Sequence, residues 1–275
     1  MDPLELRVRC DHLLEQHEAG ALEPALDAAV ALAADAAAAD TSHPIVRESL
    51  FTARFERALI LSELGALPEA AVAYQEAAET PADLDDPDQR HEIAMALLNR
   101  GICLDAVGEH DAAIETYDVV LARFRSADDP VTHDLVIRTR VNRASALLAE
   151  DRVGEALTAA EVLIGELDPA DTLEAEQLAM CVRLRAAALT ASERVAEAAE
   201  ALTAVESCTD ADPAARAQVA AALRERARFL VELDRLDDAV AALDRLAARF
   251  PDEDDPAVLE ELDEAATLRT ALAEA

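Results

Sequence analysis

The segment Leu98–Leu104 reads LNRGICL, and Val141–Leu147, 43 residues later, reads VNRASAL. Both place Asn, Arg and a small residue in a row and end on Leu, and the chain has no asparagine besides Asn99 and Asn142. The arginine belongs to a longer series, in which successive members are 43, 43, 42, 41 and 43 residues apart. Self-similarity at such a period is typical of repeat proteins. We call these residues the column arginines: Arg57, Arg100, Arg143, Arg185, Arg226 and Arg269.

Signals for the start and the turn of a helix pair recur with the same period. Asp at an N-cap satisfies free backbone N–H groups, and Pro is tolerated at the first helical position. The predicted starts are Asp86-Pro87, Asp129-Pro130, Asp212-Pro213 and Asp255-Pro256, with His43-Pro44 and Asp171-Thr172 as variants. The predicted turns are at Gly20, Gly65, Gly108, Asp151, Glu193 and Asp234. Each unit therefore reads as a helix of about 20 residues, a tight turn and a helix of about 14.

A small–large pattern on both helices, with Gly at the turn, resembles the tetratricopeptide repeat (TPR) family. Leu97, Gly101 and Leu104 match the first helix of that repeat, and Gly108 with Tyr117 matches the turn and the second helix. The commonest repeat of the family has about 34 residues, so this chain is similar to a longer, bacterial-type variant. The resemblance implies an all-α fold: a right-handed α-solenoid of stacked antiparallel helix pairs.

The period also predicts how the chain is divided. We expect a single TPR-like solenoid over residues 1–275, with a degenerate first repeat at 1–43 and a capping helix at 256–275. The full repeats between them are expected at 44–86, 87–129, 130–170, 171–212 and 213–255.

The composition excludes several classes of partner. The chain carries a net charge of −34, and all 24 of its basic residues are Arg, so it repels phosphate backbones and nucleic acid is not an expected partner. No run is apolar enough to cross a bilayer. The four cysteines form no CxxC pair and the start of the chain has no signal-peptide pattern, so we expect reduced thiols and a cytoplasmic location.

The column arginines have two interpretations. None has an acid three or four residues away on its own helix, although the chain contains 58 acids. Each must therefore find its carboxylate on another helix, where the stem of Arg packs on apolar groups and its fork binds bidentately. On this structural interpretation the pairs are buried, and removing one partner costs about 3–5 kcal/mol. The alternative is that the column contacts a ligand.

The resemblance also suggests where a partner binds. In the TPR family, Asn at the place of Asn99 and Asn142 often faces the concave groove and holds a peptide; the alternative is an Asn bonded to a neighbouring helix. The residues five and two positions before each column arginine, and two positions after it, outline a groove. Its lining ranges from apolar to basic. The alternative interpretation of the same pattern is that nearby acidic residues neutralise the basic residues of this groove. The groove candidates are Leu98, Ile102, Val141, Met180, Arg138, Arg183, Arg224 and Arg228.

No catalytic or metal-binding pattern is present. The chain has no phosphate loop, nucleophile elbow or HExxH, and its acidic loops lack the Gly and terminal Glu of an EF-hand. We expect neither an enzyme nor a cofactor. The predicted function is a non-catalytic scaffold whose groove binds a protein or peptide carrying acidic groups. The alternative is a sensor subunit of an enzyme or transcription factor, which a deep closed pocket would favour over an open groove.

Overall fold

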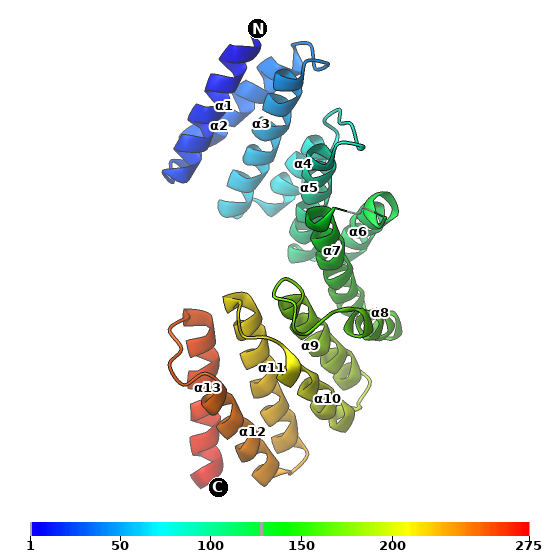
Figure 1. The fold of residues 1–275 in the computed structure, drawn as a ribbon, viewed down its shortest axis with the longest axis vertical. Coiled ribbons are helices and arrows are strands. Elements are labelled where there is room, and N and C mark those ends of the chain that lie inside the picture. Colours follow the sequence, from blue (N-terminus) through cyan, green and yellow to red (C-terminus); the bar gives the residue numbers. More distant parts are fainter. Residues whose placement is uncertain (1, 127–128, 275) are drawn as a thin grey trace. The chain divides into compact units, whose positions relative to one another are not determined.

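The computed structural model describes residues 2–126 and 129–274, and within them the secondary structure consists of helices (Figure 1). The structure is all-α, as predicted. The described α-helices are α1 (Pro3–Glu18), α2 (Leu22–Ala37), α3 (Pro44–Glu63), α4 (Leu67–Ala78), α5 (Pro87–Ala106), α6 (His110–Phe124), α7 (Pro130–Ala149), α8 (Val153–Glu166), α9 (Ala175–Ala191), α10 (Val195–Ala201), α11 (Pro213–Glu232), α12 (Leu236–Arg249) and α13 (Pro256–Glu274). A 3₁₀ helix, η1 (Leu202–Ser207), follows α10.

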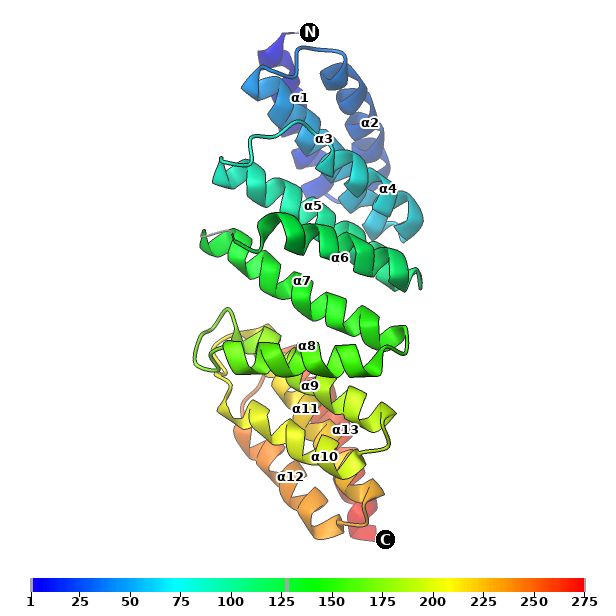
Figure 2. The same ribbon diagram turned by 90° about the vertical axis from the view of Figure 1, so that its right-hand side faces the viewer.

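The helices alternate between two roles in antiparallel pairs. We call the odd-numbered helices α1 to α11 the A helices and the even-numbered helices α2 to α12 the B helices; α13 follows the last pair. The chain divides into two compact units, residues 1–146 and 147–275, and the division falls within α7. In the second unit, α8, α10 and α12 form one layer and α9, α11 and α13 the other (Figure 2). The single continuous solenoid stays a prediction.

The Asp-Pro signals mark helix starts as predicted. Pro44, Pro87, Pro130, Pro213 and Pro256 are the first residues of their helices. The Asp86 carboxylate accepts backbone N–H groups of residues 88 and 89, and Asp212 accepts that of residue 214. Asp171-Thr172 behaves differently, because the Asp171 carboxylate holds a turn at residues 173 and 174 and α9 begins only at residue 175.

All six predicted turns are present, and each turn residue has a left-handed backbone. The φ values are 72°, 76° and 83° at the three glycines and 57°, 61° and 59° at Asp151, Glu193 and Asp234. The next residue in each turn donates its N–H to a carbonyl five residues earlier, for example Ala66 to Leu61 and Arg152 to Leu147. This is the Schellman ending of a helix, so one local motif connects all six A helices to their B helices.

The core of each pair is built on a buried alanine near the start of the B helix. Ala25, Ala70, Ala113, Ala156, Ala198 and Ala239 have no exposed surface. Four residues later a second core residue follows, which is Tyr74 in α4 and Tyr117 in α6, both 2 % exposed or less. Tyr117 lies so close to α5 that a Cβ on Gly101 would be 2.2 Å from its ring. Glycine is therefore required at residue 101, directly after the column arginine Arg100.

The B helix of the fifth pair departs from the predicted helix of about 14 residues. It is α-helical for seven residues and continues as six residues of 3₁₀ helix. The hydroxyls of Thr203 and Ser207 donate to carbonyls three residues earlier, at 2.7 and 2.9 Å. Such side-chain bonds compete with the α-helical ladder and favour the tighter turn.

Candidate partner-binding surface

Each column arginine reaches a side chain on a B helix or its continuation, as the structural interpretation predicted. Five bind carboxylates and one, Arg100, donates to the Thr116 hydroxyl. The carboxylate pairs and their N–O distances are Arg57–Glu76 at 2.7 Å, Arg143–Asp118 at 2.7 Å, Arg185–Glu161 at 3.2 Å, Arg226–Glu206 at 3.6 Å and Arg269–Asp244 at 2.5 Å.

For five of the six column arginines, all except Arg226, the choice of partner follows a rule that the sequence contains but that our sequence analysis missed. Arg143, Arg185 and Arg269 bind the acid that stands five residues after the buried alanine of the preceding B helix: Asp118, Glu161 and Asp244. The same position holds a non-acid, Val30, before Arg57 and Gln75 before Arg100. Those two arginines turn instead to the B helix of their own pair.

The expected burial of these pairs was wrong for most of the column. The side chains of Arg143 and Asp118 are 26 % and 52 % exposed, and those of Arg269 and Asp244 are 50 % and 52 % exposed. Arg226 is the buried member, with a side chain 11 % exposed. Ion pairs that water reaches are screened and contribute little, so the exposed pairs of the column add little to the free energy of unfolding.

The apolar groove candidates are mostly in the core. Leu98 and Val141 are 1 % and 2 % exposed, Met180 is half-buried, and Ile102 is 38 % exposed. A side chain that is fully packed against neighbouring helices is not available to a ligand. Of these four candidates, Ile102 is the exposed one.

The two asparagines occupy equivalent, half-buried places on α5 and α7. The hydroxyl of Tyr74, on α4, hydrogen-bonds to Asn99 and to Ser62. Burial raises the pKa of Tyr74 to about 12, and these hydrogen bonds oppose the shift. At Asn99 the geometry therefore agrees with the alternative of a bond to a neighbouring helix.

Two of the four basic groove candidates are paired across neighbouring A helices. Arg183 on α9 binds Glu225 on α11 at 2.6 Å. Arg224 on α11 binds two acids of α13, Glu261 and, at 2.8 Å, Glu264. Nearby acids thus neutralise both arginines, in agreement with the alternative interpretation of the groove.

The other two basic candidates remain exposed, one in each unit. Arg138 lies on α7 close to Asp134, where it opposes the burial that raises the pKa of that carboxyl. Arg228 lies on α11 and has no ion pair or hydrogen bond to any described residue. It lines an open hollow of about 420 Å³ over α9 and α11, together with Ala187, Thr190, Glu225, Phe229 and Glu232. This hollow is an accessible part of the predicted groove in the second unit.

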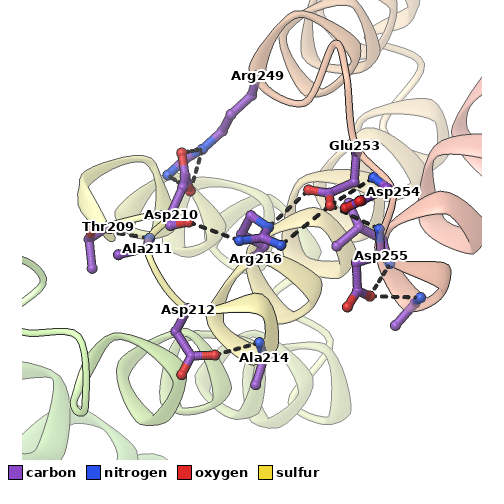
Figure 3. Close-up of polar contacts among 12 residues, drawn as sticks. Thr209, Asp210, Ala211, Asp212, Ala214, Arg216, Arg249, Glu253, Asp254 and Asp255 are labelled. Carbon is purple, nitrogen blue, oxygen red and sulfur yellow. Dashed lines mark hydrogen bonds and ion pairs between the residues drawn. The ribbon is translucent and has the colours of Figure 1, made fainter.

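The acidic loops between repeats hold neighbouring repeats together. Around the start of α11, Arg216 binds Glu253 of the next loop at 2.9 Å and the carbonyl of Asp210 (Figure 3). Asp210 binds Arg249 at 2.7 Å, and Asp255 caps α13 (Figure 3). Backbone N–H groups, chiefly that of Asp255, and Arg216 lower the pKa of Glu253.

Arginines at the equivalent position in the first unit also join neighbouring repeats. This role was not identified from the sequence. Arg47 and Arg90, like Arg216, stand three residues after the helix-starting Pro, and that position is the signal. Arg47 binds Glu92 at 2.9 Å and Arg90 binds Asp129 at 2.8 Å. Within the described ranges, no group of three or more His, Cys, Asp or Glu side chains is arranged to hold a metal ion.

Comparison with known proteins agrees with this architecture. A family model described as tetratricopeptide repeat matches residues 95–127 and 221–253. The chain therefore contains tetratricopeptide repeats. Its fold of helix pairs is similar to the apo form of the quorum sensor NprR from B. thuringiensis, with a TM-score of 0.67 and 12 % identity over 98 % of this chain and 72 % of that one.

Two further structures are similar at the level of the fold. The structure of NprR in complex with its cognate peptide NprX aligns with a TM-score of 0.55 and 13 % identity over 100 % and 75 % of the two chains. The TPR-like repeats of a putative kinesin light chain from Podosopora anserina align with a TM-score of 0.55 and 20 % identity over 74 % and 95 %. No curated protein sequence matches the chain. In the part of the TPR protein that the structure describes, no helix is long and apolar enough to cross a membrane.

Proposed function

We propose that this TPR protein is a non-catalytic scaffold that binds an acidic segment of a protein or peptide on the A-helix face of its second unit. The observation that carries the proposal is Arg228. Its guanidinium is exposed in an open hollow and, among the described residues, has no carboxylate partner, although the chain carries 58 acids. Arg183 and Arg224 on the same face are already neutralised.

The shape of the hollow supports a scaffold over a sensor. It is open to solvent and lies over two successive A helices, α9 and α11, so an extended segment crossing from one repeat to the next would fit it. Phe229 and Ala187 offer apolar contact beside the charge. NprR, a quorum sensor of similar fold, also forms a complex with a peptide, which supports peptide binding by stacked helix pairs in either role.

Charge complementarity would serve selectivity as much as affinity. A surface with a net charge of −34 repels an acidic segment at long range and accepts it where a cation is exposed. An exposed Arg–carboxylate contact contributes about 0.2–1 kcal/mol. The apolar contacts must therefore supply most of the binding free energy.

The test begins with a photo-crosslinking amino acid at Ala187, which is exposed in the hollow. The crosslinked partner is identified and purified, and its affinity is measured for Arg228→Glu and for the matched control Arg245→Glu. Arg245 is an exposed arginine on α12, the B-helix layer of the same unit. Reversing one exposed contact costs about 0.4–2 kcal/mol, which is a 2- to 30-fold loss of affinity. Equal loss in both variants, or none in either, would place the partner elsewhere.

A further inference from the structure

A second pocket lies in the first unit, whereas the surface proposed for the partner belongs to the second unit. It has a volume of about 440 Å³ and is formed by α4, α5 and the turn that leads to α6. The largest apolar side chains in its lining are Val72, Leu104 and Val107, and its polar lining consists of Gln75, Arg100 and Glu109. Val72 is 58 % exposed and Val107 39 % exposed, so apolar surface faces the pocket and the solvent.

Arg100 is the column arginine that binds no carboxylate among the described residues. It donates to the hydroxyl of Thr116, which itself donates to the carbonyl of Ala112 at 2.8 Å. Burial lowers the pKa of Arg100, and the more distant charges of Glu115 and Glu79 only partly oppose this. A half-buried guanidinium with a hydroxyl as its one hydrogen-bond partner among the described residues has donors left for an anion.

The repeat rule explains where the missing carboxylate would have come from. In three other pairs an acid five residues after the buried alanine of the preceding B helix binds the column arginine. Before Arg100 that position is Gln75, which lines the same pocket as Arg100. Its amide donates to Glu79, the C-cap residue of α4, at 2.8 Å. A neutral side chain thus stands where the fold elsewhere supplies the anion, and the pocket opens beside it.

We propose that this pocket binds a small-molecule monocarboxylate with an apolar chain. The carboxylate pairs with Arg100, in the role that Asp118, Glu161 and Asp244 fill for other column arginines, and the chain packs on the apolar lining. The charge of Glu109 in the lining disfavours a ligand with a second anionic group. The volume is within the range of about 300–1,000 Å³ that is usual for small-molecule sites.

The test uses the full chain and octanoate as the probe, with binding measured by isothermal titration calorimetry in 0.15 M NaCl. Acetate carries the charge without the chain, and 1-octanol carries the chain without the charge. We expect one octanoate per chain and at least tenfold weaker binding of both controls. Equal binding of octanol and octanoate would overturn the proposal, and so would no binding of octanoate at millimolar concentration.

Two variants and a matched control locate the site. Gln75→Glu supplies the carboxylate from the protein itself and is expected to weaken octanoate binding at least tenfold while the melting temperature stays level or rises. Arg100→Gln is expected to weaken binding as much by removing the cation. Val30→Glu adds the same charge at the equivalent position of α2, where Val30 is 50 % exposed, and should leave binding unchanged. If Gln75→Glu binds octanoate like the parent, or if Val30→Glu weakens it equally, the assignment is wrong.

Discussion

Replacing Gly101 by alanine tests the packing that sets the distance between α5 and α6. An added Cβ would stand 2.2 Å from one ring carbon of Tyr117 and 2.8 Å from two others. The ring has no exposed surface and its backbone is held in α6, so it cannot swing into solvent. Either the ring leaves its position or the two helices move apart.

The magnitude follows from two opposing effects. Overpacking a core costs typically about 1–3 kcal/mol, and contacts this short place Gly101→Ala at the upper end. Alanine stabilises a helix interior by about 1 kcal/mol relative to glycine. The net expectation is a loss of about 1–2 kcal/mol in the free energy of unfolding, which lowers the melting temperature by about 2–8 °C for a chain of this size.

Gly165→Ala is the matched control, because Gly165 is exposed in α8 and nothing lies within 4 Å of the added Cβ. It should stabilise by up to about 1 kcal/mol. Both variants are followed by circular dichroism at 222 nm during thermal and urea unfolding. Gly101→Ala/Tyr117→Leu should recover stability, because the α11–α12 pair has buried Ala227 and Leu243 at the repeat positions equivalent to Gly101 and Tyr117. If Gly101→Ala is as stable as Gly165→Ala, the close approach of ring and helix does not limit the packing.

Three further measurements follow from single contacts and from the charge. Tyr74→Phe should lower the free energy of unfolding by about 1 kcal/mol, because it removes a hydrogen-bonded hydroxyl. Tyr117→Phe should be neutral or stabilising, because that buried hydroxyl has no partner among the described residues; the opposite order in urea melts would contradict this. Burial lowers the pKa of His17, but hydrogen bonds to Glu56 at 2.5 Å and Glu63 at 3.0 Å outweigh it and raise the pKa. The stabilisation is complete below the unfolded pKa of about 6.5 and is lost as pH rises through the folded value. The parent should therefore lose more stability than His17→Gln between pH 6 and 8. Equal losses in the two proteins would exclude this linkage. Finally, the melting temperature should rise between low and molar NaCl, since a net charge of −34 repels itself, and a flat response would mean that local pairing outweighs net repulsion.

The features that could be predicted from the sequence are those decided by local chemistry. A left-handed residue followed by the Schellman bond needs only Gly, Asp or a similar residue at the right place, so Gly65 and Asp151 marked their turns. An Asp N-cap before Pro is equally local, as at Asp86. That the column arginines would seek partners on other helices also followed, because their own helices contain no acid within reach.

The features that could not be predicted depend on how neighbouring helices are rotated. Arg183 and Arg228 look alike in the sequence as cations at groove offsets, yet Arg183 pairs with Glu225 of the next A helix, whereas Arg228 forms no ion pair with any described residue. Leu98 and Val141 were predicted to line the groove because they stand at fixed offsets from the column arginines. Such offsets assume that one face of the A helix is free, whereas both side chains are buried. In the structure, neighbouring side chains cover the face of the A helix that carries these two residues. The accessible part of the site is therefore narrower than the pattern suggested.

The two kinds of inter-helix arginine pair make a last prediction about what stabilises the stack. The side chains of Arg47 and Glu92 are 15 % and 24 % exposed, and those of Arg143 and Asp118 are 26 % and 52 % exposed. Both pairs have N–O distances below 3 Å, so burial is the main difference between them. A hydrogen bond to a charged group contributes about 1.5–3 kcal/mol when shielded, and an exposed ion pair about 0.2–1 kcal/mol.

Double-mutant cycles to alanine, with unfolding followed in urea, should therefore give a larger coupling energy for Arg47–Glu92 than for Arg143–Asp118. Raising NaCl to 1 M should reduce the smaller coupling towards zero and the larger one only in part, because water reaches the exposed pair. Such an order would mean that contacts near the helix starts lock one repeat to the next, while the column arginines select which B helix each A helix faces. A coupling of about 3–5 kcal/mol for Arg143–Asp118, the value for a buried pair, would refute this division of roles and restore the column as the main support of the stack.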